Sequence, residues 1–211
     1  MTLNKCILIG LLGSFLMFLG DMTLYYDPDD YDDKDTINSI AGIMKNASIK
    51  RLYIGGLLGP IGAFIYSIGF YHIVLASQEK YLNLAWFVFL MNTFGIILGG
   101  AYHMQCAYLG LLSRHKNNGA FDEFLKFLKF QEKIVFGIMA IANIAIALII
   151  LFGLTVFPSW QALFTPIFLL IFTPIAERLP KGLHMIIRGG WLNIIYFIYY
   201  LTLLMHCTNM N

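Results

Sequence analysis

The stretch Asn83–Leu112, NLAWFVFLMNTFGIILGGAYHMQCAYLGLL, decides the fold of this chain. It contains no Asp, Glu, Lys or Arg, and it is longer than the roughly 20 apolar residues with which a helix crosses a bilayer. A helix is expected because backbone groups in lipid must form their hydrogen bonds within the segment. Small and polar residues recur at three- and four-residue spacing and therefore share one helical face. This face contains Asn92, Gly95, Gly99, His103, Cys106 and Gly110. In membrane helices such residues contact neighbouring helices, so the face is predicted to point into a helical bundle.

The composition of the whole chain agrees with a membrane protein. Hydrophobic residues make up 59% of the 211 residues and charged residues 12%, about half of the charged fraction typical of soluble domains. So few charges cannot cover a water-facing surface, and lipid is the environment that accounts for the apolar excess. The net charge of +2 gives no indication of a nucleic-acid partner.

Six stretches have the length and hydrophobicity of membrane spans. We predict one transmembrane domain over 1–211, an all-α polytopic helical bundle of about six spans. The spans lie near 4–26, 51–76, 83–112, 133–157, 159–177 and 182–206.

The first two spans carry inward faces like that of the third. In the first span this face contains Gly10, Ser14, Met17, Asp21 and Tyr25, and in the second Gly55, Gly59, Gly62, Tyr66 and Gly69. We therefore expect the first three spans to pack closely.

Two longer connections separate the spans. Within 27–50, an acidic run precedes a short helix predicted at Thr36–Asn46. Within 113–132, apolar residues share one helical face, which fits a helix lying on the membrane surface; a plain amphipathic connector without a function has the same pattern. Its apolar residues are Phe121, Phe124, Leu125 and Leu128.

Lysines and arginines predict the orientation, because they concentrate on the cytoplasmic side. Of the 14 in the chain, only Lys5 and Lys80 fall on the side of the termini. We therefore expect both termini to lie outside and the longer loops in the cytoplasm.

Ionisable residues inside the spans form the candidate site. Asp21 lies about 8 Å from the inner end of its span, and Arg188 and His103 lie at a similar depth. A charged group in a membrane is costly and is usually paired or functional, so Asp21 is expected to pair with Arg188 or with protonated His103. A buried ion pair that only holds helices together would use the same residues. The predicted ligand-binding residues are Asp21, Tyr25, Tyr102, His103, Arg188, Trp191 and Asn193.

The histidines raise the question of a metal site, but we predict neither a metal nor another cofactor. His72 and His103 are expected at opposite ends of their spans, roughly 20 Å apart by the helical rise, too far to share an ion. A weaker alternative combines His103 and His184 with Asp21.

The fifth stretch contains two Thr-Pro pairs, at Thr165-Pro166 and Thr173-Pro174. Each proline removes a backbone donor and kinks a helix, and the threonine hydroxyl can bond a freed carbonyl. Interrupted helices line the binding sites of many transporters, although a curved structural helix has the same pattern.

Four strings, GDMTLYY (20–26), RLYIGGLLGP (51–60), GGAYH (99–103) and GGWLN (189–193), resemble those of a family of uncharacterised six-helix bacterial integral membrane proteins. The resemblance extends over nearly the whole chain. It implies a bacterial inner membrane and no particular activity.

Three functions fit this pattern. The first is a protein that binds or transports a small amphiphilic ligand through the polar layer in the cytoplasmic half. The second is a membrane-embedded enzyme acting on a lipid or isoprenoid, with His103 and Asp21 as an acid/base pair. The third is a non-catalytic assembly or sensing subunit. Membrane lipid and a small amphiphilic ligand are the expected partners; the sequence identifies no protein partner.

Overall fold

The computed structural model describes residues 1–27, 36–115 and 119–209, without the side chains at 36, 38, 115, 181, 182, 184–188 and 209. Within these residues the chain is helical, and the only strand-like feature is an isolated bridge between Ser77 and Thr155, which confirms the all-α prediction. The α-helices are α1 (Leu3–Tyr25), α2 (Thr36–Asn46), α3 (Ile49–Phe70), α4 (His72–Ala76), α5 (Leu82–Leu112), α6 (Gly119–Leu151), α7 (Pro166–Leu169), α8 (Thr173–Ala176) and α9 (Lys181–Asn209). The 3-10 turns are η1 (Glu79–Tyr81), η2 (Ser113–His115), η3 (Ser159–Phe164) and η4 (Leu170–Phe172).

Five helical segments of the described chain are long and apolar enough to cross a membrane: Leu3–Tyr25, Ile49–Ala76, Glu79–Leu112, Gly119–Leu151 and Gly189–Thr208. Large apolar side chains on their outer faces are exposed, such as Phe64 at 68% and Phe87 at 57%. An exposed apolar surface of this kind is expected where a helix faces lipid. The helices and the composition are those of a membrane protein.

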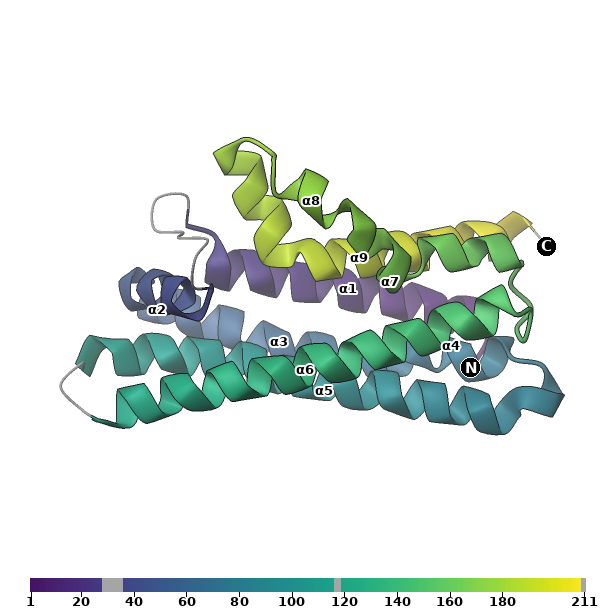
Figure 1. Ribbon diagram of the computed structural model, residues 1–211, viewed down its shortest axis with the longest axis horizontal. Coiled ribbons are helices and arrows are strands. Elements are labelled where there is room, and N and C mark those ends of the chain that lie inside the picture. Colours follow the sequence, from purple (N-terminus) through teal and green to yellow (C-terminus); the bar gives the residue numbers. More distant parts are fainter. Residues whose placement is uncertain (28–35, 116–118, 210–211) are drawn as a thin grey trace.

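The stretch 159–177, expected as the fifth span, is not one continuous helix. It folds into η3, α7, η4 and α8, because prolines interrupt the helical hydrogen-bond pattern at positions 158, 166 and 174. Thr165 caps the break, and its hydroxyl donates to the carbonyl of Ala162 at 2.6 Å. The broken segment runs along the bundle beside α9, and α9 then returns in the opposite direction. Both termini therefore lie at the same end of the bundle (Figure 1).

Helices α1 and α3 make the closest crossing in the bundle. A Cβ added to Gly69 would lie 2.4 Å from the Cα of Gly10, and one added to Gly13 would lie 3.0 Å from the backbone nitrogen of Tyr66. Only residues without side chains allow backbones to approach so closely. The predicted inward faces of α1 and α3 therefore meet.

The small residues of α5 contact several neighbouring helices. On the face predicted to point inward, a Cβ added to Gly95 would lie 2.6 Å from the sulfur of Met139 on α6, and one added to Gly110 would lie 2.8 Å from the Cβ of Met44 on α2. Gly100, beside this face, lies against α3, where an added Cβ would be 2.7 Å from the Cβ of Ala63. The predicted face therefore packs inside the bundle.

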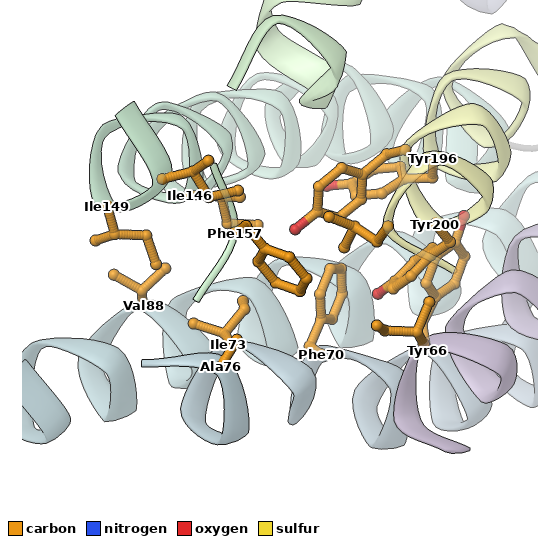
Figure 2. Close-up of a cluster of buried hydrophobic side chains, with 14 of the residues drawn as sticks. Tyr66, Phe70, Ile73, Ala76, Val88, Ile146, Ile149, Phe157, Tyr196 and Tyr200 are labelled. Atoms are coloured by element: carbon orange, nitrogen blue, oxygen red, sulfur yellow. The ribbon is translucent and has the colours of Figure 1, made fainter. Parts of the chain in front are cut away.

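Aromatic side chains fill the core between α3 and α9 (Figure 2). Tyr66, Phe70, Tyr196 and Tyr200 are all 1% exposed or less. Their rings contact one another, with Tyr66 and Tyr196 edge to face at a centroid distance of 5.4 Å. This cluster fixes the position of α9 against α3.

The segment 113–132 differs from the surface helix that was predicted. Most of it belongs to α6, which continues without a break from Gly119 into the apolar part of the helix. Leu128 is fully buried in a cluster with α2 and α5, and the other predicted apolar residues pack against this cluster. The apolar face therefore covers protein and is not available to lie on a membrane. The acidic run at 28–35 lies outside the described residues.

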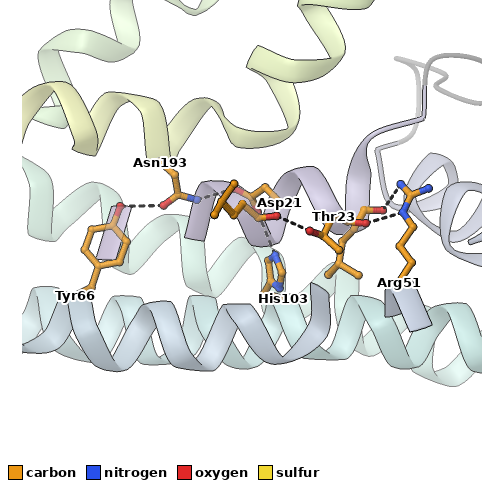
Figure 3. Close-up of polar contacts among 8 residues, drawn as sticks. Asp21, Thr23, Arg51, Tyr66, His103 and Asn193 are labelled. Carbon is orange, nitrogen blue, oxygen red and sulfur yellow. Dashed lines mark hydrogen bonds and ion pairs between the residues drawn. The ribbon is translucent and has the colours of Figure 1, made fainter. Parts of the chain in front are cut away.

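Arg51 ties the beginning of α3 to the end of α1 (Figure 3). Its Nε donates to the carbonyl of Thr23 at 2.6 Å, and its Nη2 donates to that of Leu24 at 3.0 Å and to that of Tyr26. The last carbonyls of a helix have no partner within the helix, and one guanidinium satisfies two of them, those of Thr23 and Leu24, together with the carbonyl of the C-cap residue Tyr26.

Candidate ligand site

Four side chains from four helices form a chain of polar contacts (Figure 3). The hydroxyl of Tyr66 on α3 donates to Oδ1 of Asn193 on α9 at 2.9 Å. The amide Nδ2 of Asn193 donates to Oδ2 of Asp21 on α1 at 2.6 Å. The other carboxylate oxygen, Oδ1 of Asp21, lies 3.2 Å from Nε2 of His103 on α5. One carboxylate thus contacts polar side chains of α5 and α9 and, through Asn193, is linked to that of α3.

Glycines hold the imidazole of His103 in place. A Cβ added to Gly59 would lie 2.6 Å from Nδ1 of His103, and one added to Gly20 would lie 3.3 Å from its Cε1. The ring therefore lies directly against the backbones of α1 and α3, and it is 4% exposed. The small residues at these two positions leave the space that brings His103 to Asp21.

A cavity of about 460 Å³ lies beside this polar chain. Its walls come from α1, α2, α5, α6, α9 and the broken segment, and most of the lining is apolar. A volume of this size is typical of sites for small organic ligands. The polar lining residues are Asp21, Tyr25, Tyr102, His103, Glu132, Thr173, Glu177, Trp191, Asn193 and Tyr196.

The lining residues are ordered by depth along the helices. On α1 the cavity runs from Met17 through Asp21 to Tyr25, about 12 Å at the helical rise. The apolar deep end also contains Ile96 and Met139. The opposite end of the cavity, nearer α2, is lined by Tyr25, Tyr102, His103, Glu132, Ile40 and Ile43. The cavity is therefore itself amphipathic, apolar at depth and polar toward the end of the bundle that carries α2.

The structure brings most of the predicted site residues together. Those that line the cavity are Asp21, Tyr25, Tyr102, His103, Trp191 and Asn193. The ring of Tyr25 meets that of His103 edge to face, with centroids 5.4 Å apart. The side chain of Arg188, and with it the expected pairing with Asp21, lies outside the part of the chain that the structure describes. That these residues bind a ligand remains a prediction.

Some lining residues come from segments that were not expected to contribute. Thr173 of α8 accepts a hydrogen bond from Nε1 of Trp191 at 2.9 Å, which closes the wall between the broken segment and α9. Glu132 and Glu177 bring two further carboxylates to the lining. Glu132 lies on one helical face with Val135 and Met139, and this i, i+3, i+7 spacing was readable in the sequence.

His72 belongs to a separate buried cluster. Its Nδ1 lies 2.8 Å from the carbonyl of Gly69, and its Nε2 lies 2.8 Å from the hydroxyl of Tyr199. Both ring nitrogens are thus engaged in helix contacts. Among the described residues, no three His, Cys, Asp or Glu side chains are grouped so that they could hold a metal ion; the side chain of His184 is not among those described.

The arrangement has two chemical capacities. The polar chain presents hydrogen-bonding groups at one wall of an otherwise apolar cavity, which suits a ligand with one polar end. The contact between Asp21 and His103 also places a carboxylate and an imidazole at proton-transfer distance.

The comparisons with known proteins identify the family. A family model described as "Family of unknown function (DUF6796)" matches residues 1–210. Comparisons with curated proteins and with solved structures find no match to the chain. The expected relationship to a family without an assigned activity is confirmed, and the chain belongs to this family of unknown function, DUF6796.

Proposed function

We propose that this protein binds a small amphiphilic ligand in the cavity between α1, α5, α6 and α9, and that it holds or transports this ligand within the membrane. The observation that supports ligand binding is the cavity of about 460 Å³, which is mostly apolar and has Asp21, His103 and Asn193 along one wall. A ligand would place its apolar body among Met17, Ile96 and Met139 and its polar end beside Asp21 and His103, toward α2.

The broken segment supports the transport part of this proposal. It forms one wall of the cavity from short helical pieces. Two side-chain bonds join it to α9: Trp191 donates to Thr173, and Gln161 donates to the carbonyl of Thr202. Short segments with few side-chain bonds rearrange at lower cost than a continuous helix. Such a wall is suited to opening for entry and release.

Filling the cavity tests the binding part. Gly99 lines the cavity, and a Cβ added there would have its nearest heavy atom, Cγ1 of Val135, at 3.9 Å. Gly99→Phe should therefore occupy the cavity without displacing backbone. Gly137 is the matched control, since it is exposed on α6 and an added Cβ would meet nothing within 4 Å.

Native mass spectrometry of the purified protein gives the readout. We expect an extra mass of a small organic molecule on the wild type and on Gly137→Phe, and its loss from Gly99→Phe. The proposal would be contradicted if both variants retained the same bound mass. It would also be contradicted if the folded wild type, released from gentle detergent, carried no bound mass.

A second candidate function is an enzyme that acts on a lipid or isoprenoid inside the cavity. It is favoured by the 3.2 Å contact between Asp21 and His103, both of which line the cavity. In this case His103→Gln should accumulate unreacted substrate, so that the bound mass differs from that on the wild type. Identical bound masses on the two proteins would argue against catalysis at His103.

For localisation, we propose the bacterial inner membrane with both termini outside. The common position of the termini at one end of the bundle (Figure 1) and the basic residues on the opposite side support this orientation. A carboxy-terminal alkaline phosphatase fusion should be active and a fluorescent-protein fusion dark. The reverse pattern would invert the orientation.

A further inference from the structure

We propose that the polar end of the ligand is cationic, an amine or a quaternary ammonium on an apolar body. This inference rests on the proposed function and names the chemical class that the cavity selects. It comes from the charge and the aromatic rings of the residues that line the cavity.

Carboxylates dominate the ionisable groups among the lining side chains that the structure describes. Asp21, Glu132 and Glu177 line the cavity together with one histidine, and no lysine or arginine is among the described lining residues. Asp21 contacts His103 and Asn193, and Glu132 also has a contact within the protein. The carboxylates would therefore attract a cation through their combined negative field and not as unpaired groups. A cleft lined by one sign of charge between low-dielectric walls attracts the opposite charge.

Aromatic rings line the same cavity. Tyr25, Tyr102 and Trp191 are all lining residues, and their cation–π attraction would add to the attraction of the carboxylates. Aromatic rings combined with carboxylates are the surroundings in which quaternary ammonium groups are bound. An anionic head group would be repelled by the carboxylates, and a neutral one could form hydrogen bonds but would gain neither the ionic attraction nor the cation–π attraction.

A tryptophan already in the cavity provides the assay. Trp86 and Trp160 are exposed at 42% and 54%, so the variant W86F/W160F keeps Trp191 as the only fluorophore of its kind. This variant, in phosphatidylcholine nanodiscs, is titrated with octyltrimethylammonium, octanol and octanoate, which share a tail and differ in charge. The Gly99→Phe form gives the background from partition into lipid.

We expect octyltrimethylammonium to change Trp191 fluorescence at a concentration about tenfold lower than the other two probes. Glu132→Gln with Glu177→Gln should reduce this preference at least threefold. Glu79→Gln, at an exposed position in η1, should leave it unchanged.

The other outcomes separate the two proposals. If all three probes gave equal responses, or octanoate gave the strongest, and Gly99→Phe abolished these responses, the cationic inference would be overturned. The proposed binding site would still be supported. Responses that Gly99→Phe does not alter for any probe would overturn both.

Discussion

Asn193 joins two otherwise separate polar groups, and replacing it with alanine tests the polar chain. The substitution removes the bond from Tyr66 at 2.9 Å and the bond to Asp21 at 2.6 Å. Hydrogen bonds between membrane helices contribute about 0.6 kcal/mol on average and up to about 1.7 kcal/mol, and a bond to a carboxylate belongs at the upper end. Because Asn193 borders the cavity, water entering there replaces part of the loss. We expect Asn193→Ala to lower the free energy of unfolding by about 2 kcal/mol.

The assay is unfolding by SDS in mixed micelles, followed by circular dichroism. Asn83→Ala is the control, since Asn83 is exposed at the start of α5, and it should change stability by less than about 0.5 kcal/mol. A double-mutant cycle of Asn193→Ala with Tyr66→Phe should give a coupling of about 1 kcal/mol. A loss no larger than that of Asn83→Ala, or a coupling of zero, would refute the polar chain as described.

Two further substitutions test local packing by the same unfolding measurement. Gly59→Ala would place a methyl 2.6 Å from Nδ1 of His103 and should lower the free energy of unfolding by about 2 kcal/mol. Gly42→Ala is the control: its added Cβ would meet nothing within 4 Å, so it should be neutral or stabilising. Equal stability of the two variants would contradict the contact. Arg51→Lys replaces a guanidinium that bonds several carbonyls with a single ammonium and should cost about 1–2 kcal/mol, whereas Lys50→Gln, at an exposed position, should have almost no effect.

The helix faces could be predicted because small residues in membrane helices have few uses besides contact with neighbours. Gly59 and Gly95 were placed on those faces from spacing alone, and both contact a neighbouring helix, Gly59 at His103 of α5 and Gly95 at Met139 of α6. Depth counting likewise brought Asp21, His103 and Asn193 to one layer, because the helical rise is nearly constant.

Other features depend on contacts that spacing does not encode. The contact between Thr173 and Trp191 joins segments whose relative position depends on how prolines divide the chain. The continuity of α6 was missed because the charged residues around Lys129 suggested a boundary, whereas the helix continues on both sides of them. Glu132 was therefore assigned to a surface connection, although it lines the cavity.

The central claim is that the cavity holds an amphiphilic ligand, and an experimental density map of the protein extracted with its native lipids tests it most directly. We expect an elongated non-protein density that extends from Met17 to the level of Tyr25, with its polar end beside Asp21 and Trp191. A map in which side chains close this space, leaving no cavity between α1, α5, α6 and α9, would contradict the account.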